Sequence, residues 1–196
     1  MEMMLAYVFW HWSKEKIDRL TYETHLIAFH QSLLDDPPEG FLGSIILRSH
    51  QLPWVEARGE VYQDWYLIEG FGALEGLNAG AVSGSRLNPH DEIAREVEGS
   101  ASGLYRFLKG SPYFENPGNA YWFSKPRGMT MEEFTQPFDP LLKQGQKNLW
   151  QRQMGLSQAP EYCLLSSPKV MLPEELEPFE ISVVKIWGKV RSDVHL

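Results

Sequence analysis

Residues 1–108 show an order of hydrophobic segments and breaks that limits the possible folds more than any other feature of the chain. Residues 5–12 are rich in aromatic and β-branched side chains and predict a strand, and Ser13 is a typical N-cap for a helix over 14–34. Further strands are predicted at 41–48, 61–68 and 104–108, with helical segments within 70–84 and 90–98.

A similar order follows in the second part of the chain. Glycine, proline and asparagine collect in residues 109–119, which predicts a linker. Beyond it, strands are predicted at 120–125, 149–156, 162–166 and 181–187, with helices at 131–147 and 173–176. A ferredoxin-like unit has the element order strand, helix, strand, strand, helix, strand. Its two helices cover one face of an antiparallel sheet. We therefore predict an α+β fold of two tandem ferredoxin-like halves, 1–108 and 120–190, packed sheet to sheet, with a tail over 191–196.

The composition argues against some classes of binding partner and favours one cellular compartment. A net charge of -8 and a pI near 5.3, with no basic block, argue against nucleic acid as a partner. Cys163 is the only cysteine, which excludes an intramolecular disulfide and favours a reducing, cytoplasmic setting. No apolar run approaches the roughly 20 residues of a membrane-spanning helix, so we expect no membrane association.

Strand alternation predicts that one face of the first sheet is more polar than the other. We expect this face to point away from the helices, where the second half would enclose a cleft between the halves. The candidate catalytic residues are His11 and Asp64, which could transfer protons. The candidate ligand-binding residues on the same face are Ser44, Arg48, Tyr62, Tyr66 and Arg106. Together they would suit a small acidic aromatic compound.

A structural interpretation of the same residues stays open. Arg48 and Asp64 could form only a buried ion pair at the interface between the halves, because neither charge tolerates burial alone. The histidines could likewise be surface or hydrogen-bonded residues without a function. His25 and His30 are five residues apart on the predicted helix and cannot chelate one ion, so we expect no metal site.

Glycines recur at steps of four residues from 72 to 84, along one stripe of a predicted helix. Close packing of backbone against backbone would explain them, and so would a phosphate-binding turn. We favour packing, because the preceding strand carries Gln63 and Asp64 instead of the continuous apolar run of a dinucleotide-binding unit. We expect no cofactor of any kind.

The doubled element order and the opening strand, residues 7–12 (YVFWHW), resemble the dimeric α/β-barrel superfamily. In that superfamily two ferredoxin-like units enclose a cleft, and its members include haem-degrading enzymes, monooxygenases of small aromatic compounds and chlorite-dismutase-like haem proteins. The resemblance implies cofactor-independent monooxygenase-like chemistry rather than haem, because no predicted helix of the second half holds a histidine.

Two classes of function remain open from the sequence. The chain could be an enzyme or binding protein whose cleft takes an aromatic or amphipathic compound, as the resemblance implies. It could instead be an interaction or scaffold protein with a cleft filled by side chains. We also predict a homodimer, because ferredoxin-like sheets leave edges that pair across molecules.

Overall fold

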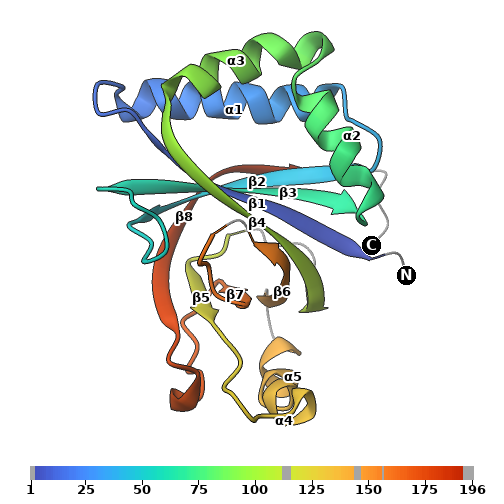
Figure 1. Cartoon of the computed structure of the whole chain (residues 1–196), viewed down its shortest axis with the longest axis vertical. Coiled ribbons are helices and arrows are strands. Elements are labelled where there is room, and N and C mark those ends of the chain that lie inside the picture. Colours follow the sequence, from blue (N-terminus) through green and yellow to red (C-terminus); the bar gives the residue numbers. More distant parts are fainter. Residues whose placement is uncertain (1–2, 112–115, 144–146, 156, 192–196) are drawn as a thin grey trace.

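The computed structural model of the chain describes residues 3–111, 116–143, 147–155 and 157–191, and their strands form one closed barrel (Figure 1). Parts of four predicted segments lie outside the described residues: 112–115 of the linker, 144–146 of the helix over 131–147, position 156 of the strand over 149–156, and 192–196 of the tail. Among the described residues, no helix is long and apolar enough to cross a membrane.

The helices and strands follow the predicted order along the chain. The first part contains β1 (Met4–Ser13), α1 (Arg19–Asp35), β2 (Phe41–His50), β3 (Glu60–Glu69), α2 (Gly72–Ala81), α3 (Leu87–Glu96) and β4 (Val97–Gly110). The second part contains β5 (Asn119–Phe123), α4 (Met131–Thr135), α5 (Phe138–Leu142), β6 (Lys147–Gly155), β7 (Tyr162–Ser166), a 3-10 turn (Glu174–Leu176) and β8 (Phe179–Val190). Helix α1 begins later than predicted, because Asp18 rather than Ser13 caps it by accepting the backbone N–H of Thr21.

The prediction of two tandem ferredoxin-like halves is wrong. All neighbouring strands are antiparallel and follow the closed order β1-β3-β2-β8-β5-β7-β6-β4. β2 pairs with β8 and β4 pairs with β6, so the two parts of the chain share one hydrogen-bonded sheet instead of pressing two sheets together. The second part also has only a 3-10 turn where a second covering helix was expected.

Closure of the barrel has a physical cause. β2 and β4 would be the edges of a four-stranded sheet, and pairing with β8 and β6 satisfies their free N–H and C=O groups. This pairing removes the open sheet edges on which we based the predicted homodimer. The homodimer therefore stays a prediction without its original reason.

Aromatic side chains fill the interior of the barrel. Trp10, Trp65, Trp122 and Trp150 point inward and are fully buried. Their rings touch, with centroids 5.6 Å apart for Trp10 and Trp122 and 5.5 Å apart for Trp65 and Trp150. Burial of a large side chain contributes roughly 2–3 kcal/mol, so this cluster is a main source of stability. The space between the two parts of the chain, where we predicted a cleft, is thus packed with side chains.

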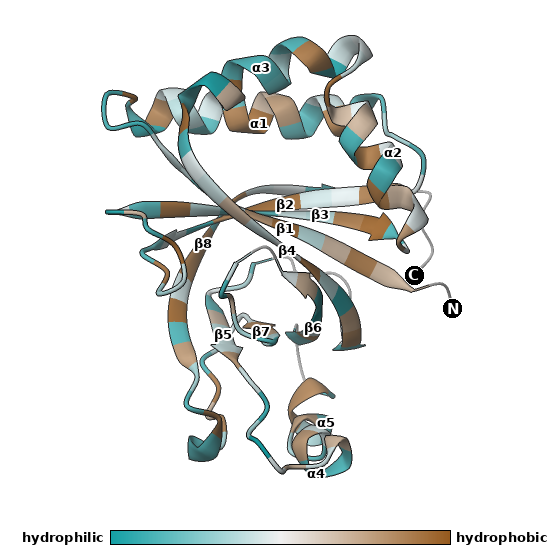
Figure 2. Ribbon diagram, viewed as in Figure 1, coloured by the Kyte–Doolittle hydropathy of each residue, from teal (hydrophilic) through white to brown (hydrophobic). Residues whose placement is uncertain are grey.

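The helices of the first part lie on the outer face of the barrel (Figure 1). α1 and α3 run side by side over β1 to β4, and their buried residues form a second core with the outward side chains of those strands. In Figure 2 these two helices alternate between brown and teal, whereas the long strands are mostly brown or pale. The buried face of α1 is defined by burial rather than by hydropathy, since its buried residues are Tyr22, Leu26, Phe29, His30 and Leu33.

Close packing explains two glycines of the predicted stripe, Gly76 and Gly80, but not Gly72, whose virtual Cβ has no atom within 4 Å. A Cβ at Gly80 would lie 2.7 Å from Cγ of Pro38, in the loop that joins α1 to β2. A Cβ at Gly76 would lie 3.4 Å from the carbonyl oxygen of Glu39 in the same loop. Glycine thus lets α2 approach this loop closely.

Substitution of Gly43 tests the junction between β2 and β8. Gly43 has φ +151°, and a Cβ there would lie 2.5 Å from the carbonyl oxygen of Lys189 on β8. We expect Gly43→Ala to lower the free energy of unfolding by about 3 kcal/mol, measured by urea denaturation. Gly59→Ala is the matched control, because Gly59 has φ +140° and no atom within 4 Å of its virtual Cβ. Equal losses in the two variants would contradict the contact with β8.

Candidate functional site

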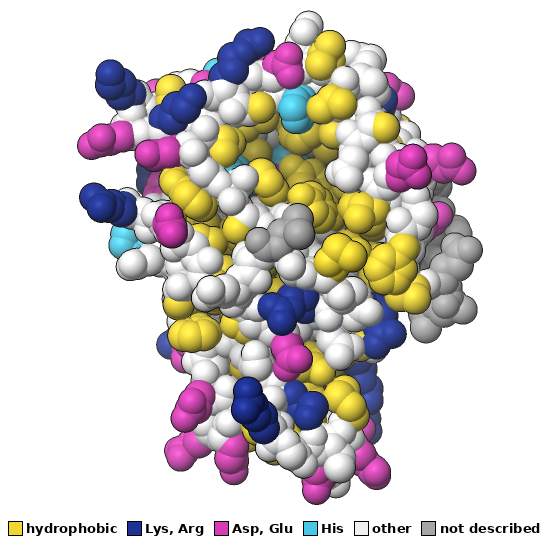
Figure 3. All heavy atoms as spheres, viewed as in Figure 1, with side chains coloured by type: hydrophobic (Ala, Val, Ile, Leu, Met, Phe, Trp, Pro, Cys, Tyr) yellow, Lys and Arg dark blue, Asp and Glu magenta, His cyan; other side chains and the backbone are white. Residues whose placement is uncertain are grey.

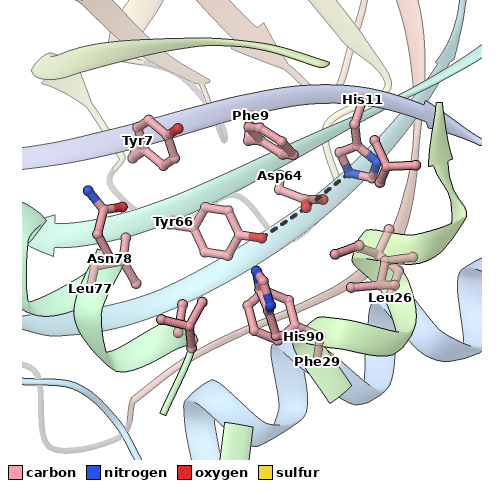
Figure 4. Close-up of a pocket in the computed structure, with 15 residues that line it drawn as sticks. Tyr7, Phe9, His11, Leu26, Phe29, Asp64, Tyr66, Leu77, Asn78 and His90 are labelled. Atoms are coloured by element: carbon pink, nitrogen blue, oxygen red, sulfur yellow. Dashed lines mark hydrogen bonds and ion pairs between the residues drawn. The ribbon is translucent and has the colours of Figure 1, made fainter. Parts of the chain in front are cut away.

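A cavity of about 380 Å³ lies between the outer face of β1 and β3 and the helices α1, α2 and α3. Figure 3 shows its mouth as a hollow surrounded by hydrophobic side chains, and Figure 4 shows its interior. The polar side chains at its wall come from both strands and from the helices, while the rest of the wall is apolar. The lining residues are Tyr7, Phe9, His11, Leu26, Phe29, Asp64, Tyr66, Leu77, Asn78, Ala81, Val82, His90, Ile93, Ala94 and Val97.

Asp64 is the charged centre of this cavity. It comes from the middle of β3, is 1% exposed, and uses a single oxygen, Oδ2, for its hydrogen bonds. Nε2 of His11 lies 3.0 Å from Oδ2, Nε2 of His30 lies 3.2 Å away, and the hydroxyl of Tyr66 donates to Oδ2 at 3.0 Å. The dashed lines in Figure 4 mark the contacts with His11 and Tyr66.

Each histidine is held at its second nitrogen as well. Nδ1 of His11 lies 2.5 Å from the hydroxyl of Tyr22 on α1, and Nδ1 of His30 lies 2.8 Å from Oγ of Ser44 on β2. All of these groups are buried. The contacts of His11 and His30 therefore connect helix α1 with β1, β2 and β3 through one carboxylate.

The second oxygen of Asp64 is left without a partner. Oδ1 is buried and accepts no hydrogen bond from any described residue. Burial raises the pKa of Asp64, but the charges and hydrogen bonds of His11 and His30 outweigh it and hold the pKa below its usual range. Burial and the charge of Asp64 raise the pKa of Tyr66, so its hydroxyl remains a donor. One residue of the cavity wall is thus an ionised carboxylate whose second oxygen has no hydrogen-bond partner among the described residues, and an unpaired buried acceptor costs free energy.

Aromatic rings form the floor of the cavity along β1. The centroids of Tyr7 and Phe9 are 6.4 Å apart and those of Phe9 and His11 are 5.4 Å apart, with interplanar angles of 26° and 28°. Phe29 of α1 and His90 of α3 close the opposite side, with their rings 5.4 Å apart. Such a slot fits a flat, largely apolar ligand.

The structure brings several of the predicted site residues together. His11, Asp64 and Tyr66 line the cavity, and Ser44 reaches Asp64 indirectly through His30. Tyr62 stacks on His11 at 5.6 Å between ring centroids. The polar face predicted from strand alternation therefore exists, but it faces the helices and not the second part of the chain. The expected cleft between the halves is replaced by a cavity beneath α1, α2 and α3.

The two predicted arginines do not reach the cavity. Arg48 Nη1 donates to Glu23 Oε1 at 2.6 Å and Arg48 Nε lies 3.5 Å from Glu60. Arg106 Nη2 donates to Gln151 on β6 at 3.0 Å. The proposed ion pair between Arg48 and Asp64 is therefore wrong. No lysine or arginine among the described residues lines the cavity, so its wall offers no cation to an acidic ligand.

Two important residues, Tyr22 and His30, were not among the predicted site residues. Both lie on the buried face of α1, which also carries Leu26, Phe29 and Leu33. His30 follows Leu26 by four residues, so helical periodicity alone places it on this apolar face. A histidine and a tyrosine on a buried helix face need polar partners, and this signal could have found them.

Within the part of the chain that the structure describes, no group of three or more His, Cys, Asp or Glu side chains is arranged to hold a metal ion.

The Asp64 network makes a prediction about stability and pH. Asp64→Asn should lower the free energy of unfolding by about 3 kcal/mol at neutral pH, because it removes the charge that two buried histidines face. The pKa of Asp64 is lower in the folded chain than its ordinary 3.8, so its contribution is complete above that value and is lost as the pH falls below it. The difference between the two proteins, followed by denaturation from pH 7 to pH 2, should therefore shrink in acid.

Asp139→Asn is the control for this prediction. Asp139 forms an exposed ion pair with Lys109, so its loss should leave the stability nearly unchanged. A difference between wild type and Asp64→Asn that stays constant down to the acid limit would contradict an ionised Asp64.

Comparison of the sequence with known protein families and with curated proteins finds no match. Several solved structures resemble this one over nearly the whole chain. One, from Fusobacterium nucleatum subsp. nucleatum, is described as a "putative monooxygenase", with TM-score 0.63, 10% identity, and coverage of 97% of this chain and 95% of that chain. A structure described as an "anthrone oxidase-like protein" gives TM-score 0.57, 10% identity, and coverage of 98% and 95%. A "putative monooxygenase" from Lactobacillus acidophilus gives TM-score 0.54, 11% identity, and coverage of 95% and 96%. At these identities the likeness shows that the chain shares its fold with monooxygenase-like proteins.

Proposed function

We propose that the cavity binds a flat, largely apolar aromatic compound with a phenolic or enolic hydroxyl, and that the protein promotes its oxidation by dioxygen without a bound cofactor. The observation that carries this proposal is the free Oδ1 of Asp64. It is an ionised, buried acceptor at the wall of an aromatic slot, and a ligand hydroxyl would satisfy it. The proposal replaces the acidic ligand predicted from the sequence, because Arg48 is paired elsewhere.

The shared fold supports the choice of reaction. The structures named above are described as monooxygenases or as anthrone oxidase-like, and this chain covers them almost entirely. Membership of the dimeric α/β-barrel superfamily, in a form where one chain builds the whole barrel, is part of the same proposal. Fold alone does not select a reaction, so the assignment depends on the carboxylate and the aromatic slot.

The chemistry can be balanced with dioxygen as the only other reactant. Asp64 Oδ1 accepts the proton of the enol hydroxyl, and the resulting enolate is electron-rich enough to give one electron to dioxygen. The two radicals combine to form a carbon–oxygen bond, and the proton held by Asp64 passes to the peroxide oxygen. Loss of water from the resulting hydroperoxide leaves a carbonyl. Overall, a methylene group and dioxygen become a carbonyl group and water. His11, His30 and Tyr66 hold the carboxylate in place throughout this sequence.

A second candidate is a binding protein that holds such a compound without converting it. The alternative in which the cleft is filled by side chains applies to the barrel interior, where buried tryptophans pack against one another. It does not apply to the cavity beneath the helices. Binding without product formation would therefore favour a carrier over an enzyme.

Anthrone in air-saturated buffer tests the reaction. We expect the wild-type protein to speed formation of the quinone, followed by absorbance and oxygen consumption, and Asp64→Asn to reduce the rate at least about 100-fold because the proton acceptor is lost. The assay is run below the unfolding temperature of the variant, and Asp139→Asn should keep the wild-type rate. A wild-type rate no higher than that of buffer alone would reject the oxidation.

Filling the cavity tests the location of the site independently of Asp64. Ala81 of α2 lines the cavity, so Ala81→Phe should weaken anthrone binding, measured by quenching of intrinsic fluorescence, by about tenfold or more. Glu75→Phe places the same ring on the exposed side of α2 and should bind anthrone as the wild type does. Equal affinities for both variants would place the ligand elsewhere.

A further inference from the structure

The helices α2 and α3 contribute mainly apolar side chains to the cavity wall, with two exceptions, Asn78 and His90. Asn78 is an exposed residue, whereas His90 is partly buried, with 31% of its side chain exposed. His90 is therefore the more enclosed of the two hydrogen-bonding groups on this side. The described residues of both helices that line the cavity are Leu77, Asn78, Ala81, Val82, His90, Ile93 and Ala94.

Helical spacing and ring packing fix the position of His90. Ile93 and Ala94 follow it by three and four residues on α3, so all three lie on the face of the helix that lines the cavity. Its ring meets that of Phe29 of α1 edge to face, with centroids 5.4 Å apart and planes at 70°. In Figure 4 the ring projects into the cavity from the helices, across from the strands that carry Asp64. His90 and Asp64 thus belong to opposite walls of one cavity.

The contact of His90 at Nδ1 determines what its other nitrogen can do. Nδ1 lies 3.2 Å from Oδ1 of Asp91, the next residue of α3. A carboxylate only accepts hydrogen bonds, so Nδ1 carries the proton in this contact, and Nε2 of the neutral ring is an acceptor. No described residue supplies a hydrogen-bond partner to Nε2. Nε2 can therefore accept a hydrogen bond from a ligand.

Two residues on opposite walls of the cavity thus each have an acceptor without a partner among the described residues, Oδ1 of Asp64 and Nε2 of His90. Two acceptors require two donors, and a flat aromatic compound can carry both as hydroxyl groups. We propose that His90 is a specificity-determining residue, which accepts a hydrogen bond from a second hydroxyl at the edge of the ligand opposite to the hydroxyl bound by Asp64. The inference rests on the proposed function and narrows its preferred ligand to an aromatic diol. Anthrone, with one oxygen, would satisfy only the first acceptor.

Three naphthalenes test this selection at equilibrium. 2,6-Dihydroxynaphthalene has a hydroxyl at each edge, 6-methoxy-2-naphthol replaces one hydroxyl with an ether that cannot donate, and 2-naphthol lacks the second oxygen. Affinities are measured by titration calorimetry without oxygen at pH 8, where histidines are mostly neutral. We expect the wild type to bind the diol about fivefold more tightly than the ether or 2-naphthol, which corresponds to one hydrogen bond.

Substitutions of His90 assign this preference to one side chain. His90→Phe keeps a ring against Phe29 but removes the acceptor, so the ratio of the affinities for diol and ether should fall to about one. His90→Gln keeps an acceptor in Oε1 and should retain part of the preference. His50→Phe is the matched control, because His50 is exposed at the end of β2 and does not line the cavity, and it should give the wild-type ratio.

Two results would overturn the role of His90. One is equal affinity of the wild type for diol and ether, a comparison that needs no variant and holds even if His90→Phe does not fold. The other is a wild-type ratio in His90→Phe together with a lower ratio in Asn78→Ala, which would place the second contact on α2. In both cases, binding of 2-naphthol that is lost in Asp64→Asn would still support the proposed site. If none of the three compounds binds the wild type, the proposed function fails and this inference fails with it.

Discussion

A single buried carboxylate governs how the first part of this chain is put together. An ionised group inside a protein has to be paired and hydrogen-bonded, and Asp64 meets this requirement with His11 from β1, His30 from α1 and Tyr66 from its own strand. Each histidine is fixed in turn by a contact at its second nitrogen. The position of α1 on the barrel is therefore set by polar contacts as well as by the apolar core around it. The unpaired Oδ1 is the exception to this pairing, in a residue that lines the cavity.

Closure of the barrel decides where a ligand can bind. Four tryptophans and Tyr105 pack against one another in the barrel interior, so buried side chains occupy the space between the two parts of the chain. Space remains on the outer face, where α1, α2 and α3 stand off from β1 and β3. The close approach of Gly80 to Pro38 anchors one end of α2 and so helps to define this space. We therefore place the candidate site in the layer between the helices and the strands.

Strand periodicity is sufficient to place His11, Asp64 and Tyr66 on one face from the amino-acid sequence alone, because side chains alternate strictly along a strand. It cannot tell which face the helices cover. The choice depends on the barrel, whose narrow interior takes the bulky Trp10 and Trp65 and so turns the polar face toward α1. Closure itself cannot be predicted from element order, since an open pair of sheets and a closed barrel use the same order of strands. The roles of Tyr22 and His30 depend on α1 lying above Asp64, which the order of elements does not specify.

The two parts of the chain differ in chemistry because their helices differ. α1 spans 17 residues and leaves a cavity above the strands, whereas α4 and α5 have 5 residues each and pack directly on β5 and β7. Phe123, Phe134, Phe138 and Tyr162 stack there in mutual contact and close the layer. The outward positions of β5 and β7 carry Tyr121, Phe123, Tyr162 and Leu164, with Asn119 and Ser166 at the strand ends, in place of a carboxylate and a histidine. The longer cover of the first part thus leaves room for a cavity beside the Asp64 network, whereas aromatic side chains occupy the corresponding layer of the second part.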